Sequence, residues 1–308
     1  MIDFQNVTKL YGKVIGVNDV TLSLQPGAYG LLGPNGSGKS TLINLIMGQL
    51  KPTIGSVHVF GECPTSNDDL YQQMGYCPSS EGMYASVTGF EWVRYLLRLQ
   101  GMKRRHATDA AKQALELVGM TNAMDRLISG YSRGMRQRTK MAQAISHDPK
   151  LLILDEPFNG LDPIGRHEMT IALQNWIESG KSLLLASHVL HEVESVTQSF
   201  LLICGGRLLA SGHAHEVNQL LVDLPNDLTI RCSAPKRLAE AIVARDMAES
   251  LKIEADQLIA STRHPSRILA ELPTWVTHNQ IEIYEIRSAD ESLQELFNSL
   301  LKIHRGEI

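Results

Sequence analysis

The stretch that decides the fold of this 308-residue chain is Gly33-Pro34-Asn35-Gly36-Ser37-Gly38-Lys39-Ser40-Thr41. It fits the pattern G-x-x-x-x-G-K-[S/T], it follows the apolar run 29–32, and it opens a helical pattern over 41–47. Because glycines lack a Cβ atom, the backbone N–H groups of such a loop can curl around the β- and γ-phosphates of a nucleotide. A glycine-rich turn that arises by chance seldom has a strand before it and a helix after it. The stretch therefore predicts a phosphate-binding loop.

Two side chains of this loop complete the predicted phosphate site. Lys39 would place a positive charge between the phosphates. The Ser40 hydroxyl would complete the shell of a Mg²⁺ ion that otherwise consists of water and nucleotide oxygens. The loop therefore predicts a site for a nucleotide together with its Mg²⁺.

A second candidate element is the segment Leu151-Leu152-Ile153-Leu154-Asp155-Glu156-Pro157, an apolar strand that ends in two acidic residues. Ligands of α/β sheets bind at the carboxyl ends of the strands, so both carboxylates would lie near the phosphate loop. Asp155 would hold Mg²⁺ through water. Successive strand residues face opposite sides, so Glu156 would point elsewhere and could polarise the water that attacks the γ-phosphate. The alternative is a pair of solvated acids that close a strand.

Apolar runs of strand length alternate with helical patterns along the first 220 residues. The runs are Val20–Leu24, Ala28–Leu32, Ser56–Phe60, Leu151–Leu154, Ser182–Ala186 and Phe200–Cys204. Two of them, 151–154 and 183–186, lack the alternation of a half-exposed sheet, which predicts strands covered on both faces. Together these patterns predict an α/β core over residues 1–86 and 148–222.

Two further regions interrupt or follow the predicted core. Between residues 87 and 147, the segments Phe90–Leu99, Thr108–Val118 and Gly134–Ile145 carry apolar residues at helical spacing, so we expect an inserted helical subdomain. After Pro225 and Asn226 the units become shorter: strand-like 228–232, 257–260 and 281–286, and helix-like 236–247 and 292–303. We expect a small C-terminal α+β domain over residues 226–308.

Composition and charge argue against several classes of protein. The chain has 29 Lys and Arg against 33 Asp and Glu, a net charge of −4, so no overall basic field favours nucleic acid. The longest apolar clusters fall far short of the roughly 20 residues that cross a bilayer, and the N-terminus lacks a secretory pattern. The four cysteines form no C-x-x-C pair, which favours reduced thiols. We therefore expect a cytosolic chain that spans no membrane and binds no nucleic acid.

A third motif is Tyr131-Ser132-Arg133-Gly134-Met135-Arg136-Gln137-Arg138. Its Met135 lies 20 residues before Asp155 in the sequence. It resembles the L-S-G-G-Q signature of ABC-type ATPases, which few other P-loop proteins have. Ser132 and Gly134 are retained, and the form Y-S-x-G-M-R-Q-R is similar to the subgroup that pairs with ABC-2-type membrane subunits. The resemblance covers residues 1–220 and implies a P-loop NTPase fold of the RecA-like kind, an ABC ATPase core with an inserted helical subdomain.

The resemblance also implies a second ATPase subunit, either another copy of this chain or a close paralogue. In that family the signature contacts the γ-phosphate of ATP bound on the opposite subunit, so ATP would join two chains head to tail. Ser132 and the Gly134 backbone precede a helical stretch and can present a hydroxyl, an N–H and a helix dipole to an anion. The alternative is a capped helix with a basic face formed by Arg133, Arg136, Arg138 and Lys140.

Three further residues match family positions. Tyr11 stands where the family stacks an aromatic ring on adenine, His188 where it has the histidine that contacts the γ-phosphate, and Asp162 in the loop that passes the partner's active site. Each also has a plain structural use, as an exposed turn tyrosine, a histidine that closes a strand, and a helix cap. The resemblance implies that Tyr11 and Asp162 bind nucleotide. It implies that His188 acts in hydrolysis with Glu156 and Lys39.

One position departs from the family pattern. The family places Gln after the Pro that follows this strand, where its amide reaches Mg²⁺ and the attacking water, whereas this chain has Ser79 after Pro78. A serine is too short for that reach. A bridging water or Glu81 could replace the amide, and the sequence leaves both open.

These motifs lead to one expected function and two alternatives. We expect a cytosolic ATPase subunit that uses ATP and Mg²⁺ to power an ABC exporter from the inner face of the cell membrane. ATP would close the dimer, and hydrolysis would reopen it. A separate integral membrane permease would dock near Met83, Tyr84, Phe90 and Trp92, residues that could equally be core. The alternatives are a soluble ABC ATPase that moves no solute and a regulatory module that ATP only switches.

Overall fold

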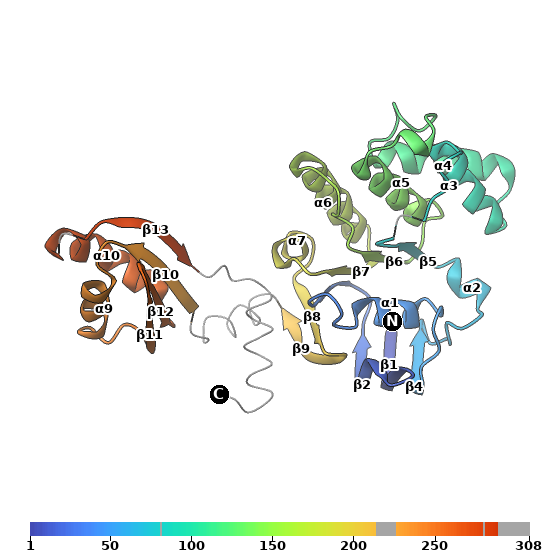
Figure 1. The fold of residues 1–308 in the computed structure, drawn as a ribbon. Helices are drawn as coiled ribbons and strands as arrows, with labels where there is room; N and C mark the ends of the chain where they lie inside the picture. The colour runs from blue at the N-terminus through green and yellow to red at the C-terminus, as the bar shows by residue number, and fades with distance from the viewer. Residues whose placement is uncertain (81, 214–225, 280, 289–308) are drawn as a thin grey trace. The chain divides into compact units, whose positions relative to one another are not determined.

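Strand β3 (Ala28–Leu32), which leads into the predicted phosphate loop, lies inside a six-stranded sheet. The computed structural model describes residues 1–80, 82–213, 226–279 and 281–288. The strand order is β5 (Met74–Cys77), β6 (Leu151–Asp155), β7 (Ser182–Ser187), β3, β8 (Ser199–Cys204) and β9 (Arg207–His213) (Figure 1). The pairings from β5 through to β8 are parallel, so the loops that follow β3, β5, β6 and β7 leave the sheet at one edge. Every residue of β6 and β7 is buried, which confirms that these strands are covered on both faces.

A three-stranded antiparallel sheet forms a second layer, with the order β2 (Val14–Leu24), β1 (Ile2–Tyr11) and β4 (Ile54–Val59). The apolar runs do not predict β1. The reason is its composition: only Ile2, Phe4 and Val7 are buried, and polar residues separate them. Such alternation is typical of a strand with one exposed face, and it leaves no continuous apolar run to detect.

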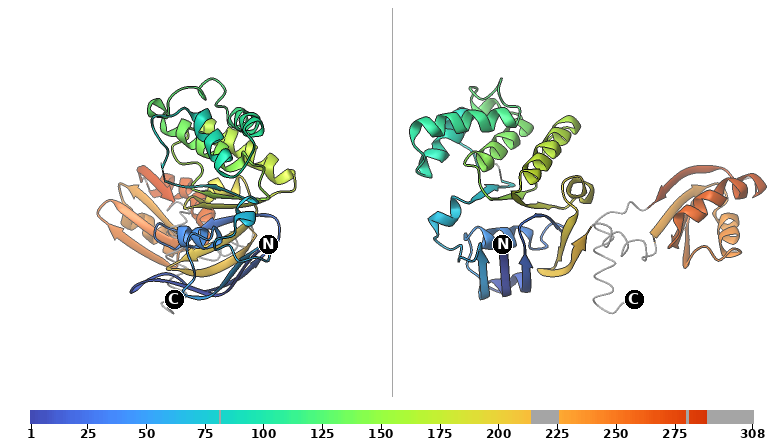
Figure 2. Two further views of the ribbon diagram at one scale, coloured as in Figure 1. Left: turned by 90° about the vertical axis from the view of Figure 1, so that its right-hand side faces the viewer. Right: turned by 180° about the vertical axis from the view of Figure 1, so that it is seen from behind.

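Helix α1 (Lys39–Ile46) follows the phosphate loop and contacts strands of both sheets (Figures 1 and 2). Its apolar residues Leu42, Ile43, Leu45 and Ile46 are buried in a core that includes Ile2 and Phe4 of β1 and Leu151 and Ile153 of β6. Since this helix is held from two sides, its first turn is a fixed platform for the loop before it.

The helices that the sequence predicts between residues 87 and 147 are present. They are α3 (Gly89–Leu99), α4 (Arg104–Leu117) and α5 (Arg133–Ile145), with a short 3₁₀ helix at Ile128–Gly130. Thr88 and Glu91 form a capping box that starts α3, and the Ser132 hydroxyl caps α5. Three other helices accompany the parallel sheet: α2 (Asp68–Tyr71), α6 (Pro163–Glu178) and α7 (Leu190–Glu194).

Contacts divide the chain into two units, Met1–Gly212 and His213–Ile308. The described part of the second unit runs β10 (Asn226–Cys232), α9 (Pro235–Val243), β11 (Ser250–Glu254), β12 (Gln257–Thr262), α10 (Pro265–Asn279) and β13 (Ile283–Ser288). Its antiparallel sheet has the order β11-β12-β10-β13, which is the ferredoxin-like arrangement of a β-α-β-β-α-β chain.

The sequence patterns miss two elements of this second unit, β11 and α10. In β11 the three residues Ser250, Lys252 and Glu254 are exposed and polar, so the strand carries little apolar signal. Pro273 interrupts the helical pattern of α10, although the structure accommodates it inside the helix. The helix expected over 292–303 falls outside the described residues.

Two further expectations concern the whole chain. Over the residues that the structure describes, no helix has the length and apolar character needed to cross a membrane. All four cysteines are free thiols; Cys63 is exposed, whereas Cys77, Cys204 and Cys232 are buried.

Candidate nucleotide-binding site

A cavity of about 440 Å³ brings the phosphate loop together with residues that are distant in the sequence. Its lining includes Tyr11, Gly16, Asn35, Gly36, Ser37, Gly38, Lys39, Ser40, Thr41, Ser79, Asp155 and Glu156. The loop follows β3, Ser79 follows β5, and the two acids end β6. Because these strands are parallel, their carboxyl ends meet at the edge where α/β sheets bind ligands.

The loop backbone adopts a conformation that requires glycine. Gly38 caps α1 with φ 110°, in the left-handed region, and a Cβ atom there would lie 2.7 Å from the carbonyl oxygen of Gly16. Within the loop, the N–H of Ser37 donates to the Pro34 carbonyl oxygen at 3.1 Å. Ser37 Oγ is buried and, among the described residues, has no hydrogen-bond partner. A buried hydroxyl of this kind is suited to donate a hydrogen bond to an oxygen atom of a ligand.

Lys39 points back along the loop. Its Nζ donates to the carbonyl oxygens of Gly33 at 2.6 Å and Pro34 at 3.3 Å, and lies 3.8 Å from Glu156 Oε1. Burial lowers the pKa of Lys39, and the negative charges of Glu156 and Asp155 oppose that shift. The ammonium therefore sits within a ring of oxygen atoms at the position that a terminal phosphate would approach.

Asp155 is the point where two hydroxyl groups converge. Its Oδ2 accepts a hydrogen bond from Ser79 Oγ at 2.9 Å and lies 3.3 Å from Ser40 Oγ. Ser40 and Asp155 both line the cavity, so the hydroxyl could bind Mg²⁺ directly and the carboxylate could hold the ion through water. Oxygen donors are also the ligand type that Mg²⁺ prefers. The residues present therefore fit the ion.

The structure shows where the Ser79 side chain lies. Its hydroxyl donates to Oδ2 of Asp155, the carboxylate expected to hold Mg²⁺, at 2.9 Å. Glu81 lies outside the described residues. The sequence does not predict this contact, because it gives the length of a side chain but not how close the loop backbone comes to the carboxylate.

Glu156 lies between Lys39 and His188. Its two carboxylate oxygens are 2.9 and 3.0 Å from His188 Nδ1, and its N–H donates to the Ala186 carbonyl oxygen at 2.8 Å. With φ 54°, Glu156 is one of the few non-glycine residues in the left-handed region. The residue directly follows β6, and only 11 % of its side chain is exposed. The structure thus joins Lys39, Glu156 and His188 in one cluster.

Tyr11 lies at the mouth of the cavity. The residue is 45 % exposed, and its hydroxyl is 3.4 Å from Thr41 Oγ1. Lys9 Nζ is 5.6 Å from the centre of the Tyr11 ring. A half-exposed aromatic face next to a phosphate site is suited to stacking on a flat base.

Ser132, Gly134 and Asp162 do not line this cavity. Ser132 Oγ accepts a hydrogen bond from the Met135 N–H at 3.2 Å and caps α5. Asp162 Oδ1 accepts from the Gly165 N–H at 2.8 Å and caps α6. Both residues therefore serve as helix caps in the single chain, and the structure does not bring them to the Lys39 cluster.

The alternative for this motif, a capped helix with a basic face, is only partly met. Lys140 is just 4 % exposed and donates to backbone carbonyl oxygens at 78–80. Arg138 donates to the Val118 carbonyl oxygen and to Glu168 of α6. The sequence did not predict these contacts of Lys140 and Arg138. Residue spacing shows that a cation lies on a helix, but it does not show which loop packs against that helix.

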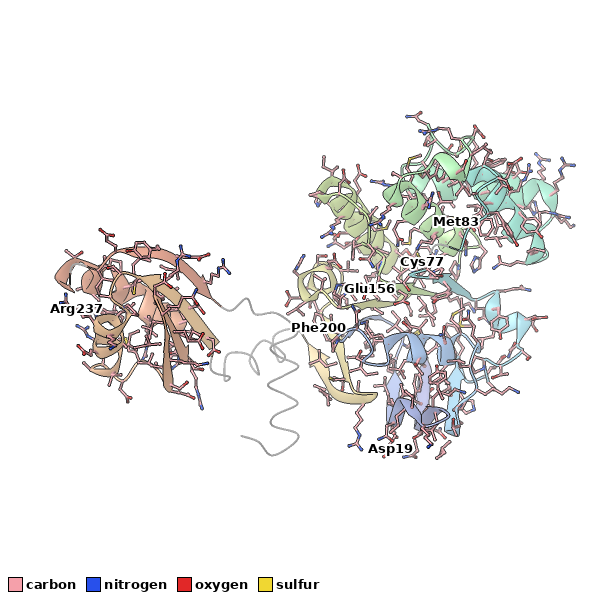
Figure 3. All side chains as sticks on the ribbon, viewed as in Figure 1. Asp19, Cys77, Met83, Glu156, Phe200 and Arg237 are labelled. Atoms are coloured by element: carbon pink, nitrogen blue, oxygen red, sulfur yellow. The ribbon has the colours of Figure 1, made fainter. Side chains whose placement is uncertain are left out.

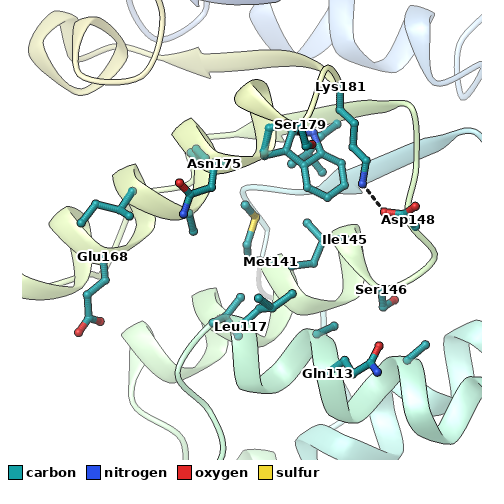
Figure 4. Close-up of a pocket in the computed structure, with 18 residues that line it drawn as sticks. Gln113, Leu117, Met141, Ile145, Ser146, Asp148, Glu168, Asn175, Ser179 and Lys181 are labelled. Atoms are coloured by element: carbon teal, nitrogen blue, oxygen red, sulfur yellow. Dashed lines mark hydrogen bonds and ion pairs between the residues drawn. The ribbon is translucent and has the colours of Figure 1, made fainter.

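A larger cavity, of about 540 Å³, lies between α4, α5 and α6 (Figure 4). Its lining is mostly apolar, with Leu117, Met141 and Ile145 among its residues. Among the described residues, the one cation that lines it is Lys181, which is paired with Asp148 and lies 4.0 Å from the centre of the Trp176 ring. The described lining residues therefore include no unpaired cation that could hold a phosphate. In Figure 3, Glu156 and Cys77 mark the strand ends beside the smaller cavity.

A parallel sheet with a glycine-rich loop, a loop lysine and strand-end acids defines a P-loop nucleotide-binding protein. Comparison with known proteins narrows this class. The sequence profile described as "ABC transporter" matches residues 17–159. The bacitracin transport ATP-binding protein BcrA of Enterococcus faecalis is 37% identical over 222 residues, which cover 71% of each chain.

Another relative matches almost the whole length. The daunorubicin/doxorubicin resistance ATP-binding protein DrrA of Streptomyces peucetius is 31% identical over 309 residues, covering 97% of this chain and 92% of that protein. Among solved structures, a dimeric bacterial ABC transporter cassette superposes with a TM-score of 0.64 at 23% identity, covering 69% of this chain and 98% of the cassette. The chain belongs to the family of ABC transporter ATP-binding subunits.

Proposed function

We propose that this chain binds ATP in the cavity of the phosphate loop and hydrolyses it to drive export through a separate membrane subunit. The observation that carries the proposal is the cluster of Lys39, Glu156 and His188, with contacts of 3.8 Å and 2.9 Å. This cluster supports the proposal because a cation, a carboxylate and an imidazole together could hold a γ-phosphate and an attacking water. The loop residues 33–41 and the ring of Tyr11 would hold the nucleotide.

The proposed roles follow from the position of each group. Lys39 would exchange its loop carbonyl oxygens for phosphate oxygens and stabilise the charge that develops on them. Glu156 would accept the proton of the attacking water, and His188 would orient that carboxylate and contact the γ-phosphate. Ser40 and Asp155 would hold Mg²⁺, which when bound offsets the negative charge of the β- and γ-phosphates.

A second ATPase subunit would complete the site. Ser132 and Gly134 stand at the N-terminal end of the 13-residue helix α5, outside the chain's own nucleotide cavity. A helix N-terminus attracts anions, so this end is suited to a γ-phosphate held by another chain. Asp162 stands at the start of α6, and we propose that it links the two sites. ATP would then close the dimer, and hydrolysis would reopen it.

The membrane partner is proposed from the relatives, which are named for bacitracin transport and drug resistance. We place the chain at the cytoplasmic face of the membrane, bound to a permease, with residues 87–147 as a signature subdomain and 226–308 as an accessory domain. Tyr84 is 69 % exposed, whereas Trp92 is 8 % exposed and donates to Gln143. Tyr84 is therefore available to a partner, and Trp92 belongs to the core.

Two measurements test the proposal. The purified chain should release phosphate from Mg²⁺-ATP, and the Lys39→Ala variant should not. From its own cells, the tagged chain should co-purify with an integral membrane protein after gentle detergent extraction. ATP turnover with no such partner would favour a soluble ATPase, and nucleotide binding without turnover would favour a regulatory module.

A further inference from the structure

Lys140 of α5 is bonded to the backbone of the loop that follows β5. Its Nζ donates to the carbonyl oxygens of Pro78 at 2.8 Å, Ser80 at 3.1 Å and Ser79 at 3.4 Å. The residue is only 4 % exposed, and three successive carbonyl oxygens offset the loss of water around its charge. A buried ammonium placed in this way holds three adjacent residues at a set distance from α5.

The side chain of the central residue in that loop points to the other side. Ser79 Oγ donates to Asp155 Oδ2 at 2.9 Å, and Ser40 Oγ lies 3.3 Å from the same oxygen. An unbroken series of contacts therefore runs from Lys140 through residue 79 to the carboxylate and on to the phosphate loop.

Because the serine side chain is short, the position of the loop decides whether Ser79 can bond to Asp155. Serine has one side-chain torsion to its hydroxyl, so the backbone sets where Oγ lies to within a small range. A shift of about 1 Å in the loop would lengthen the Ser79–Asp155 contact beyond hydrogen-bonding distance. The family's longer glutamine could adapt to such a shift, but Ser79 cannot. A rigid support for the loop is therefore needed here, and Lys140 supplies it.

A second contact shows that α5 braces this edge of the sheet in more than one place. Gln137, one turn before Lys140, donates from Nε2 to the Pro157 carbonyl oxygen at 2.8 Å. Pro157 directly follows the acidic pair, so α5 contacts both the segment after Asp155 and the loop whose Ser79 bonds to Asp155. Through these two contacts, α5 is attached to the ends of the strands β5 and β6.

We propose that Lys140 and Ser79 form a positioning pair for Asp155: Lys140 holds the loop backbone, and Ser79 orients the carboxylate that binds Mg²⁺. The inference rests on the proposed role of Asp155. Since Ser132 caps the N-terminus of α5, the pair also connects the helix that would meet the partner's nucleotide to the metal site of its own chain.

The test measures metal binding rather than turnover. The full chain is loaded with a non-hydrolysable ATP analogue, and its Mn²⁺ affinity is measured by electron paramagnetic resonance. Ser79→Ala and Lys140→Met should each weaken Mn²⁺ binding roughly tenfold, the lower end of what loss of a group supporting a metal ligand causes. Ser79→Thr, which keeps the hydroxyl, should bind Mn²⁺ almost as the parent does.

The decisive result is the double variant. If Lys140 acts through Ser79, then Lys140→Met should have little further effect once Ser79 is alanine, so the two losses should not add. Independent, additive losses would overturn the proposal, as would normal Mn²⁺ affinity in either single variant. Lys150→Met is the matched control, because Lys150 is exposed and donates to Gln73 Oε1 away from the loop.

Two further variants separate this inference from the proposed function. Asp155→Asn should abolish tight Mn²⁺ binding; if it does not, the metal site itself is wrongly placed. If Asp155→Asn loses Mn²⁺ while the Ser79 and Lys140 variants retain it, only the positioning pair fails. Analogue affinity without metal and the melting temperature verify that each variant is folded. Should Lys140→Met not fold, Lys140→Gln replaces it and is judged by the same criterion.

Discussion

His188 Nδ1 lies 2.9 Å from one carboxylate oxygen of Glu156 and 3.0 Å from the other. The same carboxylate is 3.8 Å from the Lys39 ammonium. Glu156 therefore sits between two nitrogen groups that come from different loops. This position is suited to a carboxylate that takes a proton from water while its neighbours hold the phosphate.

Replacing the carboxylate by an amide tests that role. Glu156→Gln keeps the size of the side chain but removes the base, so ATP turnover should fall about 100-fold, as when one catalytic stabiliser is lost. ATP binding should persist, and an ATP-bound dimer should accumulate on size-exclusion chromatography. Glu116→Gln, on the exposed face of α4, is the control. Turnover within a few-fold of the parent would remove Glu156 from the mechanism.

Lys39 provides a test of nucleotide binding itself. Lys39→Ala removes the cation that now bonds to the Gly33 and Pro34 carbonyl oxygens, so affinity for a fluorescent ATP analogue should fall at least about tenfold. Lys51→Ala changes an exposed lysine and should bind the analogue normally. Equal affinity in the two variants would count against the phosphate-loop assignment.

Ser132 tests the shared site. In the Glu156→Gln background, Ser132→Arg should abolish the ATP-dependent dimer while analogue binding to the monomer stays within about twofold, because Ser132 lies outside the chain's own cavity. Sedimentation with and without ATP distinguishes the two forms. Ser129→Arg, three residues earlier and also exposed, should still dimerise. A Ser132→Arg chain that dimerises normally would refute the head-to-tail arrangement.

Arg138 links three helices, and its loss should lower stability. Its guanidinium donates to the Val118 carbonyl oxygen, which follows α4, at 2.9 Å and to Glu168 of α6 at 2.6 Å. Arg138→Met should reduce the free energy of unfolding by about 1–3 kcal/mol, because a part-buried carbonyl oxygen loses its donor. Glu168→Gln disturbs only the more exposed partner and should cost no more than about 1 kcal/mol. Calorimetry of both variants compares the two; equal effects would contradict this account.

His147 should make stability depend on pH. Burial lowers its pKa below the ordinary value of 6.5, against the hydrogen bond between Nε2 and the Met74 carbonyl oxygen. The unfolded chain takes up this proton first as the pH falls below about 6.5, so the folded state loses stability there and regains it above. His147→Gln should flatten that part of the profile of melting temperature against pH. His106→Gln, which is exposed, should leave it unchanged. A profile unaltered by His147→Gln would exclude this source.

Sequence patterns are sufficient for the features that depend on neighbouring residues. One such feature is the succession of a strand, a glycine-rich loop and a helix over residues 28–47. Two others are the buried strand 151–154, which ends next to Asp155, and the residue that caps α5. Strand β1 and helix α10 show the limit of this approach. In β1 the apolar residues are few and alternate with polar ones, and in α10 Pro273 interrupts the helical pattern. Tertiary packing stabilises both elements in spite of these weak sequence signals.

The amino-acid sequence alone determined that this protein has a phosphate loop, an acidic strand end and a signature segment, since each is a run of adjacent residues with its own backbone preference. Only the tertiary structure decided which side chains meet. Ser79 bonds to Asp155, which lies 76 residues later in the chain. Lys140 bonds to the carbonyl oxygens of Pro78 and Ser80, which lie about 60 residues before it. Such contacts depend on how parallel strands and a helix pack, and a side chain's reach can be judged only once the backbone that carries it is in place.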